Sequence, residues 1–111
     1  MRKRTIAVLL ALVIGAIAAV PVLAATPKIT GTVGPGFTIS MKKPTKAGKY
    51  TLVVSDKSSI HNFHLKGKGV NVKTSVPATG SKTFKITLAK GKYTFLCDPH
   101  PTSMKGSFTI R

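Results

Sequence analysis

The chain has 111 residues, of which 18 are Lys or Arg and only two are Asp or Glu, with one Cys and no Trp. This length holds one small domain and excludes a multidomain enzyme. A single Cys cannot form a disulfide within the chain, so stability must come from core packing, a metal or a partner.

The first segment of the chain has the pattern of an export signal. Residues 2–4 read Arg-Lys-Arg, residues 6–20 carry no charge, and Val-Leu-Ala at 22–24 is typical of a cleavage site. We therefore expect a signal peptide over 1–24 and a mature domain over 25–111, exported to the periplasm, to the outer face of the cytoplasmic membrane or out of the cell. The alternative is an uncleaved anchor, because the apolar run approaches the roughly 20 residues of a spanning helix.

The mature domain shows short alternating runs of apolar and polar residues, broken by Gly, Pro, Asp or Ser, and no helical periodicity. Strands are predicted over Lys28–Val33, Phe37–Met41, Lys49–Ser55, His61–Lys66, Lys82–Leu88, Lys92–Cys97 and Lys105–Ile110, with a weaker one near Val70–Thr74. Seven or eight strands in so short a chain indicate an all-β fold, a Greek-key β-sandwich or small barrel.

Side chains of types that can bind metals are grouped at and after Cys97, where a predicted strand ends. Cys97, His100 and Met104 place a thiol, an imidazole and a thioether within eight residues, and His61 lies upstream on a predicted apolar face. A thiolate and two imidazoles with a weak axial thioether suit copper that cycles between Cu(I) and Cu(II). The spacing therefore predicts a copper site.

Taken singly, these residues have simpler explanations. A lone Cys is usually a small buried residue, Met104 alone would belong to the core, and His100 alone would be a solvated loop residue. Their joint occurrence favours a metal. His64 serves as a comparison, because alternation places it on the outward side with Asn62 and Lys66, opposite Phe63, and predicts a surface residue or one that supports the ligands. If His64 were the ligand instead of His61, the phase of the strand would shift by one residue.

At these residues the chain resembles the cupredoxins of the plastocyanin, amicyanin and pseudoazurin kind, which are small type 1 blue-copper proteins. The motifs that carry the resemblance are Ile60-His61-Asn62-Phe63-His64, Gly91-Lys92-Tyr93-Thr94-Phe95-Leu96-Cys97, Cys97-Asp98-Pro99-His100-Pro101 and Met104-Lys105-Gly106. The first motif is close to the amicyanin form. The resemblance covers roughly residues 49–111.

The resemblance implies one-electron transfer at a mononuclear copper site. The ligands that it implies are His61, Cys97 and His100 in the equatorial plane and Met104 on the axis. It also implies that hydrogen bonds of Asn62 tie the loop of His61 to the loop of Cys97, and that electrons leave through His100. One departure is that three residues separate His100 from Met104, where plastocyanin and pseudoazurin have four and amicyanin has two.

The sequence leaves three functions open. The first is an electron carrier that is not an enzyme, because the chain offers no Glu and only Asp56 and Asp98 as acids. The second is a copper carrier or delivery protein of the same fold, although tracts rich in Met or His, which would favour delivery, are absent. The third is a metal-free sandwich that adheres to polyanions.

The charge of the mature domain is strongly positive. Residues 25–111 carry 15 of the basic side chains and both acids, a net charge of +13. Nucleic acid is not expected as a partner, because Arg clusters and interleaved aromatic residues are absent. The positive charge either serves solubility alone or attracts a partner. That partner is an acidic redox protein, bound transiently, or an anionic membrane surface. We expect a monomer.

Overall fold

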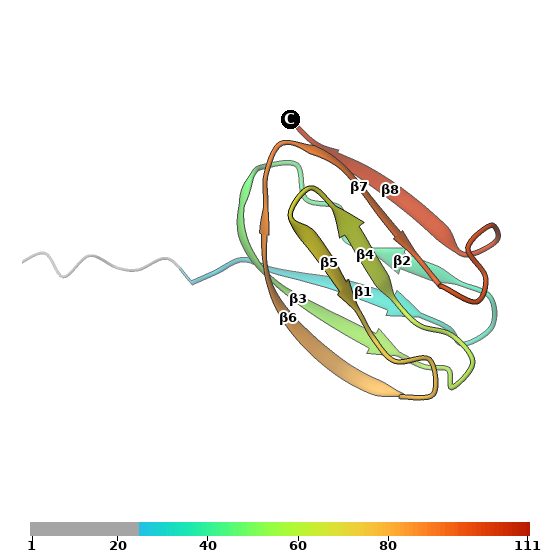
Figure 1. Ribbon diagram of the computed structural model, residues 1–111. Coiled ribbons are helices and arrows are strands. Elements are labelled where there is room, and N and C mark those ends of the chain that lie inside the picture. The colour runs from blue at the N-terminus through green and yellow to red at the C-terminus, as the bar shows by residue number, and fades with distance from the viewer. Residues whose placement is uncertain (1–24) are drawn as a thin grey trace, which may run out of the picture.

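The computed structural model describes residues 25–111 as two four-stranded β-sheets that pack face to face (Figure 1). In chain order the strands are β1 Lys28–Val33, β2 Ile39–Met41, β3 Gly48–Asp56, β4 His64–Gly67, β5 Val70–Lys73, β6 Gly80–Leu88, β7 Gly91–Leu96 and β8 Lys105–Ile110. The predicted all-β sandwich of about eight strands is confirmed. The predicted signal peptide over 1–24 lies outside the described residues. Over 25–111, no helix is long and apolar enough to cross a membrane.

The two sheets share the strands in an order that requires the chain to change sheet three times. One sheet has the order β2-β1-β3-β6 and the other has the order β5-β4-β7-β8. Strands β1 and β3 pair in parallel, and the other pairings among the described strands are antiparallel. At the sheet edges β2 lies near β8 and β5 lies near β6. Segments far apart in the sequence are thereby brought to the same end of the sandwich.

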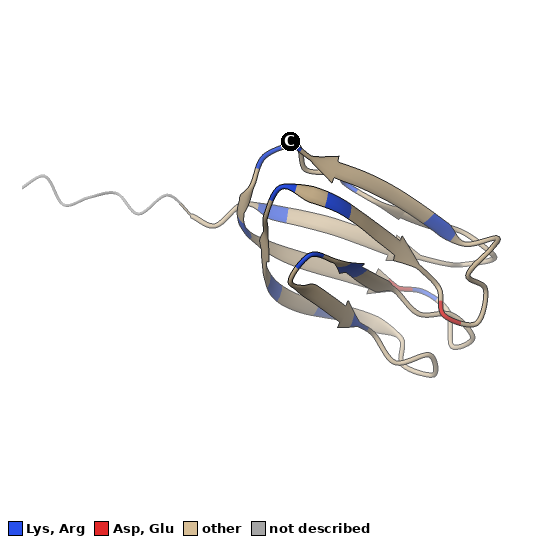
Figure 2. Ribbon diagram, turned by 45° about the horizontal axis from the view of Figure 1, so that its top comes forward, with Lys and Arg blue, Asp and Glu red and all other residues tan. Residues whose placement is uncertain are grey.

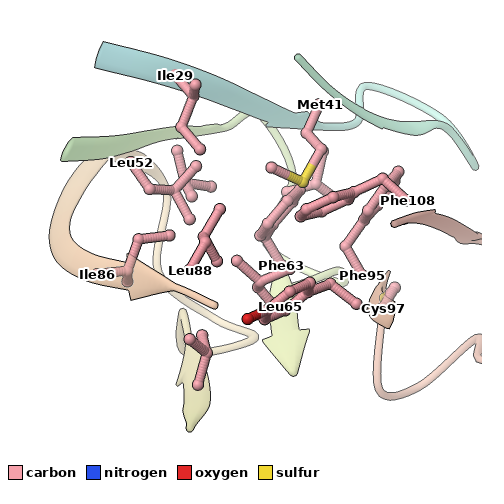
Figure 3. Packing of buried hydrophobic residues seen from close by; sticks show 14 of the residues in the cluster. Ile29, Met41, Leu52, Phe63, Leu65, Ile86, Leu88, Phe95, Cys97 and Phe108 are labelled. Carbon is pink, nitrogen blue, oxygen red and sulfur yellow. The ribbon is translucent and has the colours of Figure 1, made fainter. Parts of the chain in front are cut away.

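The core lies between the sheets and is built from every second side chain of each strand. Phe63 stacks on Phe95 with ring centroids 5.8 Å apart, and Tyr93 stacks on Phe108 at 5.3 Å. Figure 3 shows Phe95 next to Cys97 at the end of this cluster. The aromatic core therefore packs next to Cys97, the residue that the sequence predicts to be the thiol ligand.

The loops fall into two groups, one at each end of the sandwich (Figure 1). The connections β1–β2, β3–β4, β5–β6 and β7–β8 lie at one end, termed the site end because residues 61, 97 and 100 belong to it. The connections β2–β3, β4–β5 and β6–β7 lie at the far end, together with residues 25–27 and the C-terminus.

Strand β4 begins later than predicted, and this changes which way a side chain faces. The strand expected over His61–Lys66 is β4, His64–Gly67, so the prediction that residues 61–63 are extended strand was wrong. The reason is that the backbone of Phe63 bonds to Thr74, which donates its N–H to the Phe63 carbonyl at 3.0 Å and accepts the Phe63 N–H on Oγ1 at 2.9 Å. Asn62, expected on the outward side with His64, is consequently buried.

Candidate metal centre

Three side chains converge at the site end from two connections of the fold. His61 comes from the β3–β4 connection, Cys97 directly follows β7, and His100 comes from the β7–β8 connection. The Nδ1 atoms of the two imidazoles lie 3.1 Å apart, and the Cys97 Sγ lies 3.7 Å from each. The point that lies in the plane of these three atoms and is equidistant from them is about 2.0 Å from each. This distance is close to the lengths of the bonds that imidazole and thiolate form with first-row metal ions.

The three donors differ in exposure. His61 and Cys97 are completely buried, whereas His100 is partly exposed. The Nε2 atom of His61 is buried and has no hydrogen-bond partner among the described residues, so the Nδ1 that faces Cys97 and His100 is the atom through which this imidazole interacts. A buried imidazole whose only engaged nitrogen points at a thiol and a second imidazole fits a metal ligand better than a core residue.

The loop that carries Cys97 and His100 is closed by its own backbone. His100 donates its N–H to the Cys97 carbonyl, Met104 donates to the His100 carbonyl, and Cys97 donates to the Met104 carbonyl, each at 3.0 Å. The three residues between His100 and Met104 therefore form one tight turn. This turn leaves the side chain of Met104 buried at the site end. Met41 ends β2, pairs with Gly31 inside β1 and belongs to the core between the sheets.

Asn62 joins the two connections that supply the ligands. Its Oδ1 accepts the backbone N–H of Asp98 at 2.8 Å, and its Nδ2 donates to Asp98 Oδ2 at 2.8 Å and to the Thr74 carbonyl at 3.1 Å. Its backbone N–H lies 3.4 Å from the Cys97 Sγ. Such a contact stabilises a thiolate, and the side-chain bonds hold His61 and Cys97 at a fixed separation.

His64 lies outside the donor group, and both of its ring nitrogens are occupied. Nδ1 lies 2.8 Å from Asp98 Oδ1 and Nε2 lies 2.6 Å from Asn71 Oδ1. Partial burial raises the pKa of Asp98, but the hydrogen bonds from His64 and Asn62 outweigh this effect and hold that pKa below its usual value. His64 therefore supports the carboxylate that positions Asn62.

An aromatic side chain that the sequence analysis did not assign to the site covers it from outside. The ring of Phe37 makes edge contacts with the imidazoles of His61 and His100, at centroid distances of 4.9 and 5.0 Å. Phe37 was expected inside a strand, but β2 begins at Ile39 and leaves Phe37 in the preceding connection with 60% of its surface exposed. Ile60, next to His61, is 56% exposed.

Asp56 is a buried acid at the site end whose role the sequence did not indicate. It ends β3 and continues that strand's inward-facing series. Its Oδ1 accepts the Ser58 N–H at 3.0 Å, whereas Oδ2 has no partner among the described residues. Burial raises the pKa of Asp56, and the Ser58 hydrogen bond and the charge of His61 oppose this rise.

Comparison with known proteins places these residues in context. The model of a family described as copper binding proteins, plastocyanin/azurin family, matches residues 32–111 of the chain. No curated protein sequence matches it. The three donors gathered at the site end are compatible with a single type 1 copper site.

Two solved structures have a similar fold. One is auracyanin A, a "blue" copper protein from the green thermophilic photosynthetic bacterium Chloroflexus aurantiacus, with 20% identity, a TM-score of 0.51, and coverage of 76% of this chain and 98% of that chain. The other is a chain of a heme-copper terminal oxidase dimer, with 15% identity, a TM-score of 0.52, and coverage of 81% of this chain and 68% of that chain. At these identities the likeness concerns the sandwich alone.

Proposed function

The chain belongs to the plastocyanin/azurin family of copper-binding proteins, and we propose that it carries single electrons between redox partners through one copper ion. Nδ1 of His61, Sγ of Cys97 and Nδ1 of His100 would hold the ion, and the thioether of Met104 would supply a weaker fourth donor. The observation that carries this proposal is the triangle of three donor atoms, whose sides are 3.1, 3.7 and 3.7 Å.

The chemistry of the donor set favours electron transfer over catalysis. When bound, copper supplies a one-electron couple between Cu(I) and Cu(II). The hydrogen bonds of Asn62 hold the loops of His61 and Cys97 together, so the donors keep one arrangement in both oxidation states. Four protein ligands leave no position for a substrate, which argues against an enzyme.

Electrons are proposed to leave through His100, the most exposed of the three donors. Its imidazole lies beside the ring of Phe37, and both Phe37 and Ile60 are exposed at the same end. An apolar surface around an exposed ligand suits brief docking of a redox partner, because it orients the partner without holding it tightly. The pattern of residues 1–24 supports export of the protein before it meets that partner.

Electrochemistry of the copper-loaded protein separates this function from copper delivery. We expect reversible one-electron voltammetry, with the same copper content after repeated cycles in the presence of a chelator. The fixed donor geometry is the reason, because neither oxidation state has to open the site. Loss of copper to the chelator on reduction, or irreversible voltammetry, would favour a copper carrier and contradict the proposal.

A further inference from the structure

The two ends of the sandwich differ in charge. Both acids of residues 25–111, Asp56 and Asp98, belong to the site end (Figure 2). Four lysines accompany them, in connections of the site end or within the three strand residues next to it: Lys57, Lys73, Lys82 and Lys105. The net charge contributed at this end is therefore small.

The far end carries most of the positive charge and, among the described residues, no acid (Figure 2). Its cations lie in the far-end connections, beside the two ends of residues 25–111, or within two residues of a strand end there. Every one of these side chains is exposed. This group is termed the basic pole: Lys28, Lys42, Lys43, Lys46, Lys49, Lys66, Lys68, Lys90, Lys92 and Arg111.

The chain enters the sandwich at the basic pole. Residues 25–27 lead into β1 at the far end (Figure 1), so whatever precedes them in the chain is joined to the sandwich at the basic pole. Residues 6–20, a short distance upstream, are uncharged and apolar. Before cleavage, or as an uncleaved anchor, this segment with the composition for entering a bilayer is thus attached to the most basic surface of the domain.

The same distribution argues against a redox protein as the main occupant of the basic pole. Strand β3 has nine residues and runs from the far end to the site end, a span of about 30 Å at 3.3 Å per residue. A partner held at the basic pole would lie at the opposite end from His100 and Phe37. Attraction there would turn the proposed electron exit away from the partner.

We propose that the basic pole docks on anionic lipid headgroups and leaves the site end facing away from the bilayer. Clustered lysines bind anionic membranes because the membrane surface has a negative potential. Each lysine near that surface raises the affinity of the protein for the membrane by about fivefold. The inference goes beyond electron transfer and depends on no metal. An acidic redox protein at the same pole is the competing outcome.

The test measures binding of copper-free residues 25–111 to vesicles in about 0.1 M salt. All eight strands and their pairings lie within residues 28–110, so this part holds the complete sandwich. Vesicles contain either phosphatidylcholine alone or phosphatidylcholine with about 30% phosphatidylglycerol. Two variants lose the same charge: Lys43, Lys46, Lys68 and Lys90 to Gln at the basic pole, and Lys57, Lys73, Lys82 and Lys105 to Gln at the site end.

We expect binding to the anionic vesicles only, at least tenfold weaker in the basic-pole variant and within about threefold of the wild type in the site-end variant. Arg at the four basic-pole positions should restore binding, which separates charge from folding defects. Equal losses in the two Gln variants would overturn the proposal. Absence of any preference for anionic vesicles would also overturn it and would assign the lysines to an acidic protein or to solubility. Neither result bears on the copper site, because the protein carries no metal in the test.

Discussion

At the scale of single residues, the two histidines near β4 differ in what their nitrogens face. His61 turns Nδ1 toward Cys97 and His100, whereas both nitrogens of His64 are occupied by Asp98 and Asn71. We expect His61→Ala to lower copper affinity by more than roughly 100-fold, and His64→Ala to lower it by less than about tenfold. Chelator competition followed in the visible spectrum measures both. An intact site in the His61 variant and a destroyed one in the His64 variant would reverse the assignment.

Met104 is expected to tune the site more than to hold the metal. Met104→Leu should keep copper bound and raise the reduction potential, because it removes a weak donor to the oxidised ion. Its side chain is buried in the turn that links it to Cys97 and His100, so Leu should fit with little loss of packing. Voltammetry of the two proteins measures the difference. An unchanged potential and spectrum would indicate Met41, a backbone oxygen or no axial ligand.

The buried carboxyl of Asp56 makes stability depend on pH. Its pKa is raised by burial, so its contribution to stability is greatest below the unfolded-state pKa of about 3.9 and is lost as the pH rises through the folded-state pKa. Asp56→Asn should therefore raise the free energy of unfolding of the copper-free protein by about 1 kcal/mol at pH 7 and by almost nothing at pH 3. Urea unfolding at the two pH values tests this. A gain of equal size at both would show that the charge is not the cause.

The sequence predicted the residues that meet at the site and, through the family resemblance, the hydrogen bonds of Asn62, but it did not predict the rest of their surroundings. His61, Cys97 and His100 were identified from donor type and spacing, which depend on chemistry that the sequence shows directly. Phe37 and Thr74 were not, because their contacts with His61 and Phe63 arise only when distant connections pack at one end. The burial of Asp56 was likewise set by its place in β3.

At the scale of elements, the pairing of β7 with β8 depends on a residue without a side chain. A Cβ at Gly106 would overlap the ring of Phe95, its partner across the two strands. Gly106→Ala should therefore displace Phe95 and lower the free energy of unfolding by roughly 1–3 kcal/mol. Ser107→Ala, at an exposed neighbouring position, is the control and should stay within about 0.5 kcal/mol of the wild type. Equal stability of the Gly106 variant and the wild type would contradict this packing.

Alternation predicted the strands well where a strand has one face in the core and one in solvent, as in β3. It failed over residues 61–63, where three consecutive side chains are buried. There the backbone bonds to Thr74 and to the Cys97 thiol instead of a neighbouring strand. Alternation of apolar and polar residues cannot reveal such a segment, because side chains from other parts of the chain determine its conformation.

At the scale of the whole molecule, the net charge was evident from composition but its distribution was not. The far end gathers its cations because three connections and both ends of residues 25–111 lie there, an outcome of strand order. The sequence predicted attraction to an acidic redox partner from the net charge alone, without placing that charge relative to His100. The structure places most of that charge at the other end, which separates the surface suited to an anionic bilayer from the surface suited to electron exchange.

The central claim is that His61, Cys97 and His100 hold one copper ion in a type 1 site. The most direct measurement is the visible absorption spectrum of the oxidised protein loaded with one equivalent of copper, beside that of Cys97→Ser. We expect an intense blue colour in the wild type, from charge transfer between the Cys97 thiolate and copper, and its loss in the variant. A wild-type protein that takes up one equivalent of copper and stays pale would contradict the account.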